Sequence, residues 1–292
     1  MVLWPLFPVV TMCPGSVCGT RCGHRKTGGK ASILGAPIIA RDRKSVNGFL
    51  NPWRRKPWDA IIKEYGLCGT LLLTFQQPCG LVRPFRFTLA SKFSGTYQSA
   101  VIAAAGYENI CVVGGTSAAM GTGILAELAF RLLDAGMSAE EIADALEKEK
   151  KKIVVVALVD TLKYLKRGGR ISKTAAFAGG VLNIKPVISV TDGEIHLLGK
   201  ARGSKMGNNL LVQEIDKAGG IDFSKPVLLG YSGLSGALLL KYIEDSRHIW
   251  EGHLREVCYT TVGSVIGTHL GPGAVVVAFF KNQYNAEQNS SD

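Results

Sequence analysis

Two short hydroxyl side chains, Ser94 and Thr96, flank Gly95 where the sequence predicts the start of a helix that runs to about Ala105. Ser and Thr are favoured at helix N-termini, where free backbone amides and the helix dipole attract anions. A glycine between them lets a ligand approach the backbone closely. Ser94, Gly95 and Thr96 can therefore hold a carboxylate or a phosphate. Plain helix capping is the alternative interpretation of the same residues.

Three longer polar side chains adjoin glycines. His269 lies within Gly267–Gly273, a segment with three Gly and one Pro that predicts a tightly shaped loop. Binding and catalytic His residues often sit on such loops. Arg170 and Arg202 each have glycine as a direct neighbour, which leaves the guanidinium accessible for phosphate or carboxylate. A structural His and two ordinary surface Arg residues are the alternatives.

The segment Gly114–Gly123 is a Gly-rich turn between a predicted strand at 109–113 and a predicted helix at 124–135. That context suits phosphate binding at a helix N-terminus. The turn contains neither G-x-G-x-x-G nor G-K-S/T, so a tight structural turn is the simpler interpretation. A small-molecule enzyme or nucleotide-binding protein that uses this turn is the alternative function. We expect no catalytic residues, because the sequence has no Ser-His-Asp, Cys-His, H-E-x-x-H or paired-carboxylate pattern.

Helices and strands alternate from about residue 88 onward, which indicates an α/β protein. Ser138–Glu141 is a capping box that starts a helix, and Ile153–Leu158 is a β-branched strand. The pair Asp192-Gly193 predicts the turn of a hairpin.

The succession of predicted helices and strands changes near residue 158, which indicates a domain boundary. We expect the remainder of a first α/β domain over residues 88–158, a second α/β domain over 159–281 and a polar tail over 282–292. A ligand cleft commonly forms between two such domains.

The composition also divides near residue 88. Residues 1–87 carry 13 Lys and Arg against 3 Asp and Glu, whereas residues 88–292 carry 21 against 20. The first part also holds five of the seven Cys and three of the four Trp. Arg, Cys and Trp have GC-rich codons. We therefore interpret residues 1–87 as an aberrant, poorly ordered segment that a shifted reading frame or a misplaced start would produce.

One cluster of candidate zinc ligands lies in this first part: Cys13, Cys18, Cys22 and His24. Thiolates and an imidazole suit tetrahedral zinc, but the spacing matches none of the paired C-x2-C motifs and no second ligand pair follows. We therefore expect no metal, and no cofactor other than a bound ligand.

Charge, hydropathy and cysteine content narrow the function class. The net charge of +11 comes almost entirely from residues 1–87, so the patterned remainder lacks the basic footprint of a nucleic-acid-binding protein. No apolar stretch reaches the length of about 18 residues that predicts a membrane span. After residue 87 only Cys111 and Cys258 remain, which indicates a reducing, cytoplasmic compartment.

Six segments together resemble the DegV family of bacterial proteins. They are Ser94–Ala100, Met120–Gly123, Asp160–Ser172, Leu182–Pro186, Lys200–Gly203 and Gly267–Gly273. The third segment, DTLKYLKRGGRIS, is long and specific, and the resemblance covers about residues 88–281. Two segments usual in the family are not found: an initial strand that ends in Asp-Ser-Thr, and a later Thr-Ser-Gln-Pro. Gly114-Gly115 stands where the family often has Asp-Ser.

The resemblance implies a two-domain α/β fold with a tunnel between the lobes that binds a long-chain fatty acid. It implies that the Ser94–Thr96 segment and His269 hold the carboxylate, and that Arg170 and Arg202 contact the phosphate or the kinase. Some members deliver the lipid to a separate fatty acid kinase, which phosphorylates the carboxylate for phospholipid synthesis. We therefore expect a lipid-binding subunit of a kinase system rather than an enzyme. Its expected partners are the fatty acid and the kinase, with no nucleic acid.

Overall fold

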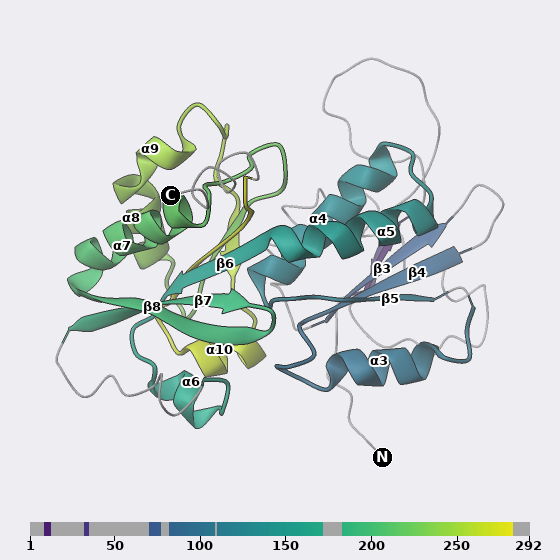
Figure 1. The fold of residues 1–292 in the computed structure, drawn as a ribbon, viewed down its shortest axis with the longest axis horizontal. Coiled ribbons are helices and arrows are strands. Elements are labelled where there is room, and N and C mark those ends of the chain that lie inside the picture. Colours follow the sequence, from purple (N-terminus) through teal and green to yellow (C-terminus); the bar gives the residue numbers. More distant parts are fainter. Residues whose placement is uncertain are drawn as a thin grey trace, which may run out of the picture.

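Two β-sheets with helices packed on them make up the computed structural model (Figure 1). The structure describes residues 85–108, 110–171 and 183–282. Before residue 85 it describes only the strand backbones of 9–12, 32–34, 70–76 and 82–84. The candidate zinc cluster within Cys13–His24 and the tail beyond residue 282 lie outside these ranges.

The first sheet has the strand order β2-β1-β3-β4-β5. Its strands are β1 Val9–Met12, β2 Ser32–Leu34, β3 Thr70–Gln76, β4 Val82–Thr88 and β5 Cys111–Gly114. Helix α3 (Thr96–Ala104) connects β4 to the parallel strand β5. Figure 1 shows α3 on one side of β5 and α5 (Ala139–Glu149) on the other. We call this sheet and its helices the first lobe.

The second sheet, at the heart of the second lobe, has the order β10-β9-β11-β6-β7-β8. Its strands are β6 Ile153–Leu158, β7 Ile184–Thr191, β8 Glu194–Arg202, β9 Leu228–Tyr231, β10 Tyr259–Thr261 and β11 Val275–Phe280. Its helices are α6 Lys163–Arg167, α7 Gly203–Lys217, α8 Ala237–Asp245, α9 Arg247–Trp250 and α10 Ser264–Leu270. A short 3-10 turn, Lys150–Lys152, precedes β6. Within the described ranges, no helix is long and apolar enough to cross a membrane.

The central strands β6 and β11 are apolar along their whole length because both of their faces are covered. Val155 and Ala157 of β6 belong to the core that faces the first lobe, whereas Val156 and Leu158 belong to the core under α7 and α8. Alternate residues of β11 divide between the two cores in the same way. Successive side chains of a strand point to opposite faces, so two-sided burial requires an unbroken apolar run.

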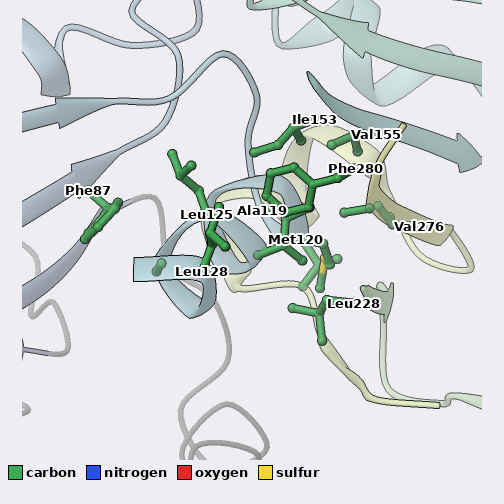
Figure 2. Close-up of a cluster of buried hydrophobic side chains, with 14 of the residues drawn as sticks. Phe87, Ala119, Met120, Leu125, Leu128, Ile153, Val155, Leu228, Val276 and Phe280 are labelled. Atoms are coloured by element: carbon green, nitrogen blue, oxygen red, sulfur yellow. The ribbon is translucent and has the colours of Figure 1, made fainter. Parts of the chain in front are cut away.

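Helix α4 (Met120–Asp134) lies between the two sheets and joins their cores. Figure 2 shows Met120 and Leu125 of α4 between Phe87 of β4 and Phe280 of β11. Helix α4 also packs against β9, where a Cβ at Gly230 would overlap the end of the flexible Met120 side chain. Dense packing of this kind fixes the position of one lobe relative to the other.

Two predictions that rest on short-range signals are confirmed, the capping box and the hairpin turn. Ser138 and Glu141 form the capping box of α5: the Ser138 amide donates to Glu141 Oε2 at 2.8 Å, and the Glu141 amide donates to Ser138 Oγ at 3.3 Å. Asp192 and Gly193, with φ values of 49° and 72°, form the turn between β7 and β8. Such turns require positive φ, which Asp and Gly tolerate.

Two predicted boundaries are wrong. Strand β6 pairs with β11 and β7, so residues 153–158 belong to the second lobe rather than to the first domain. The folded core also begins before residue 88, because β1 to β4 lie within or extend into residues 1–87 and the side chains of Phe85 and Phe87 are 1% and 0% exposed. Their two-residue spacing places both rings on one face of β4. The origin of residues 1–87 in a shifted reading frame stays a hypothesis.

We predict that Phe87→Ala lowers the free energy of unfolding by about 3–5 kcal/mol, because it removes a fully buried ring from the core. Urea denaturation followed by circular dichroism measures the change. Tyr107→Ala is the matched control, because the Tyr107 ring is 62% exposed, and its expected effect is within about 0.5 kcal/mol. If both variants lose the same small amount, β4 is not part of the core.

Candidate functional site

A cavity of about 260 Å³ opens between the two lobes. Its apolar lining residues are Leu89, Phe93, Ala118, Ala119, Val155, Ala157, Leu165, Ile188, Val190, Ile195, Val265, Ile266, Leu270 and Val276. Among the described residues, its polar lining consists of Ser94, Thr96, Arg170 and His269. The structure therefore brings four of the six predicted site residues to one mainly apolar cavity.

Ser94 and Thr96 contact each other at the start of α3. Their hydroxyl oxygens are 2.7 Å apart, so one donates to the other, and the Thr96 amide donates to Ser94 Oγ at 3.3 Å. Both side chains are half-buried, whereas Gly95 between them is exposed and does not line the cavity. The two hydroxyls thus support the helix start and face the cavity. That they hold a carboxylate stays a prediction.

Arg170 connects the two lobes beside these hydroxyls. Its Nε and Nη2 donate to the carbonyl oxygen of Phe93, the residue before Ser94, at 3.4 and 3.2 Å. Its Nη1 donates to the carbonyl oxygen of Gly168 at 2.6 Å. The guanidinium is exposed, and its planar fork ties the loop before α3 to the end of α6. A contact between Arg170 and phosphate or a kinase stays a prediction.

His269 lies in the last turn of α10 and not in a loop, so the predicted loop is wrong at this residue. Gly263 and Gly267 weaken the helical signal in the sequence. The helix nevertheless forms and ends at Gly271, which has a φ of 76° and whose amide donates to the Gly267 carbonyl at 2.8 Å. This helical placement presents the half-buried His269 ring to the cavity.

The surroundings of His269 favour its neutral form. Burial, and to a smaller extent the positive charge of Arg170, lowers the pKa of His269 below its ordinary value. A neutral imidazole can donate a hydrogen bond through one nitrogen and accept through the other. At neutral pH the site therefore presents a hydrogen-bonding His.

Arg202 stands apart from this cluster. It is the last residue of β8, is exposed and does not line the cavity. Arg170 and Arg202 have the same signal in the sequence, an adjacent glycine. That signal does not indicate which part of the structure each side chain contacts. A contact between Arg202 and phosphate or a kinase stays a prediction.

Packing accounts for two glycines of the Gly-rich turn. A Cβ at Gly114 would lie 2.8 Å from the ring of Tyr97, and a Cβ at Gly115 would lie 2.7 Å from the carbonyl oxygen of Thr88. Both distances are shorter than the 3.0 Å that real Cβ atoms keep. The same turn also supplies Ala119 to the apolar wall of the cavity.

Sequence reasoning did not identify the hairpin of β7 and β8 as a wall of the cavity. Its tip docks on the first lobe, where the Gly193 amide donates to the Thr116 carbonyl at 2.8 Å. Lys92 Nζ and Glu194 Oε1 form an ion pair at 2.8 Å beside it. The Asp-Gly turn was visible in the sequence, but nothing local to it identifies the surface on which it docks.

We predict that the pKa of His269 lies below the ordinary value of about 6.5, because burial and Arg170 disfavour its charged form. NMR titration of the imidazole measures this pKa. Arg170→Gln should raise it toward the ordinary value by removing a positive charge, whereas Arg255→Gln, at an exposed position outside the cavity lining, should leave it unchanged.

The lowered pKa of His269 also determines the direction in which the stability of the fold changes with pH. As the pH falls below about 6.5, the unfolded chain binds a proton at His269 before the folded chain does. The contribution of His269 to stability is therefore complete above that pH and is lost as the pH falls toward the pKa of the folded state. A measured pKa at or above the ordinary value would contradict the described burial of this ring.

Comparisons with known proteins agree with this architecture. The model of a family described as "uncharacterised protein, DegV family" matches residues 85–282. A DegV domain-containing protein of Caldanaerobacter subterraneus subsp. tengcongensis is 35% identical over 205 residues, which cover 68% of this chain and 72% of the relative. A protein of Thermotoga maritima named fatty acid-binding protein is 31% identical over 191 residues, covering 64% of this chain and 65% of the relative.

A solved structure has the same fold. It is a DegV family protein from Thermus thermophilus, described by its fatty acid binding, with a TM-score of 0.57 at 28% sequence identity. The match covers 71% of this chain and 70% of that chain. The matched family model covers the second lobe, the first lobe from Phe85 onward and all the residues that line the cavity. The chain belongs to the DegV family.

Proposed function

We propose that this protein binds a long-chain fatty acid in the cavity between its lobes and presents the carboxylate to a separate fatty acid kinase. One observation carries the proposal: four polar side chains meet at one part of a cavity whose other described lining residues are apolar. A fatty acid divides into a charged head and an apolar tail in the same way.

The contacts among the polar side chains support placing the head group beside them. Ser94 and Thr96 contact each other, and Arg170 binds the carbonyl of Phe93 directly before them. Val155 and Val276 line the same cavity from the central strands and are only 3% and 2% exposed. We place the carboxylate beside Ser94 and Thr96 and the acyl chain against Val155 and Val276.

The energetics of a fatty acid fit this arrangement. Each buried methylene contributes about 0.8 kcal/mol, so the acyl chain supplies most of the binding energy. The carboxylate needs hydrogen-bond donors, because a buried charge without partners costs several kcal/mol. Ser94 Oγ and the His269 imidazole are the donors that we assign to it, with Thr96 shaping the same helix start.

The relatives support the ligand class. The Thermotoga maritima relative is named a fatty acid-binding protein, and the Thermus thermophilus structure is described by its fatty acid binding. The proposed kinase rests on the family resemblance of the sequence and on the exposure of Arg170 and Arg202, whose guanidinium groups suit a phosphorylated product or an acidic docking surface.

Native mass spectrometry of the purified protein tests the ligand class. We expect a co-purifying mass equal to one fatty acid, and after delipidation we expect saturable binding of stearate. A bound nucleotide, or delipidated protein that binds no fatty acid, would overturn the proposal. Turnover of a lipid by the purified protein without a kinase would overturn its role as a carrier.

We predict that Ser94→Ala weakens stearate binding by about 1–3 kcal/mol, roughly 5- to 150-fold in Kd, because a buried carboxylate oxygen loses its donor. Displacement of a fluorescent fatty acid measures the Kd. Ser99→Ala is the matched control, because Ser99 lies on the same helix but is exposed and outside the cavity lining. Equal affinities for the two variants would remove Ser94 from the site.

We predict that Arg202→Ala leaves the Kd for stearate within about twofold of the wild type, because Arg202 lies outside the cavity lining. The same variant should slow phosphorylation of the bound fatty acid by the partner kinase, which a kinase-coupled assay measures. Arg255→Ala, at another exposed position outside the cavity lining, is the control. Loss of lipid binding in Arg202→Ala would instead make Arg202 a ligand of the carboxylate.

A further inference from the structure

Gly168, at the end of α6, has no side chain, and the ring of His269 lies against it. A Cβ at Gly168 would overlap His269 Nδ1 and would lie 2.7 Å from Cε1 of the same ring. Real Cβ atoms do not come closer than 3.0 Å to such neighbours. The imidazole therefore occupies the space that any other residue at position 168 would fill.

The backbone of Gly168 does not itself require glycine. Its φ and ψ are −74° and −8°, in the right-handed helical region that every residue adopts. The next residue is the opposite case: Gly169 has a φ of 67°, and a Cβ there would meet nothing within 4 Å. In this Gly-Gly pair, Gly169 serves the turn, whereas Gly168 leaves room for His269.

Gly168 also connects to Arg170, the cationic side chain of the site. Its carbonyl oxygen accepts from Arg170 Nη1 at 2.6 Å, and Arg170 in turn reaches the Phe93 carbonyl beside Ser94. The α-carbon of Gly168 thus meets the ring of His269, while its carbonyl holds Arg170. One residue sets the position of both side chains relative to the cavity.

The packing of α6 against α10 is reciprocal, which makes this arrangement rigid. A Cβ at Gly271, after α10, would overlap the ring of Tyr164 on α6 and lie 2.6 Å from its Cε2. Each helix therefore places a ring against a glycine of the other. His269 cannot move toward α6, and Tyr164 cannot move toward α10, without overlap.

We infer that Gly168 is the positioning residue of the head-group site: its missing side chain lets the His269 imidazole lie against the end of α6 and face the cavity. The consequence for lipid binding rests on the proposed function, whereas the contact between Gly168 and His269 does not. A methyl group at position 168 would push the ring out of this place toward solvent.

The test compares Gly168→Ala with Gly267→Ala. A Cβ at Gly267 would meet only the Val262 carbonyl at 3.8 Å, so the control adds a methyl group two residues from His269 without overlap. In ligand-free Gly168→Ala, we expect the imidazole NMR signals to shift and the pKa of His269 to rise toward its ordinary value, because the ring gains solvent. We expect Gly267→Ala to match the wild type in both.

The binding arm uses stearate and a double-mutant cycle. Gly168→Ala should raise the Kd for stearate about tenfold, a coupling typical of residues in contact. In a His269→Ala background the same change should have almost no further effect, since the ring that it displaces is gone. An equal loss in both backgrounds would show that Gly168 acts through something other than His269.

The outcomes separate the inference from the proposed function. Unchanged His269 signals and pKa in Gly168→Ala overturn the inference, whatever the lipid data show. Wild-type protein that binds no fatty acid overturns the proposed function and leaves the NMR comparison valid. If Gly168→Ala unfolds, Gly168→Ala/His269→Ala should recover a folded thermal transition because the methyl group then has room. Failure to recover it also overturns the inference.

Discussion

Polar side chains that line an apolar cavity need hydrogen-bond partners, because burying a polar group without one destabilises the fold. This constraint organises the site. Ser94 and Thr96 satisfy each other, and Arg170 is satisfied by two backbone carbonyls from different lobes. Burial lowers the pKa of His269, and the neutral imidazole that this favours costs less to bury than the charged form. The polar groups are thus arranged before any ligand arrives, and a preorganised site loses less free energy on binding.

The core determines where this cavity can exist. Strands β6 and β11 are covered on both faces, by α7 and α8 on one side and by α4 on the other. Helix α4 lies close to β6 at Gly121, which has no side chain. A Cβ there would lie 2.7 Å from Val155 Cγ2. Before the start of α4, where the small residues Ala118 and Ala119 line the cavity, the same face of the sheet becomes its apolar wall. The proposed acyl site therefore lies on the side of the sheet that elsewhere forms the core.

Short-range signals predicted much of this structure, and long-range pairing explains what they missed. The capping box at Ser138 and the turn at Asp192-Gly193 are local, so the sequence indicates them directly. The partner of Arg170 is the Phe93 carbonyl, 77 residues away, and nothing near either residue predicts that contact. The sequence identified His269 by residue type and glycine content, but the same glycines hid the helix that carries it. Strand β6 likewise belongs to the second lobe because it pairs with β11, a strand far away along the chain, and its own position in the sequence does not indicate this.

A crystal structure of the protein with bound stearate tests the central claim most directly. The account predicts one fatty acid in the cavity between the lobes, with a carboxylate oxygen within hydrogen-bond distance of Ser94 Oγ and the other facing His269. Its methylene groups should lie against Val155, Ala157 and Val276, which line the cavity from the buried strands. Stearate bound in the opposite direction, with its carboxylate against these apolar residues, would contradict the account, as would stearate bound outside the cavity.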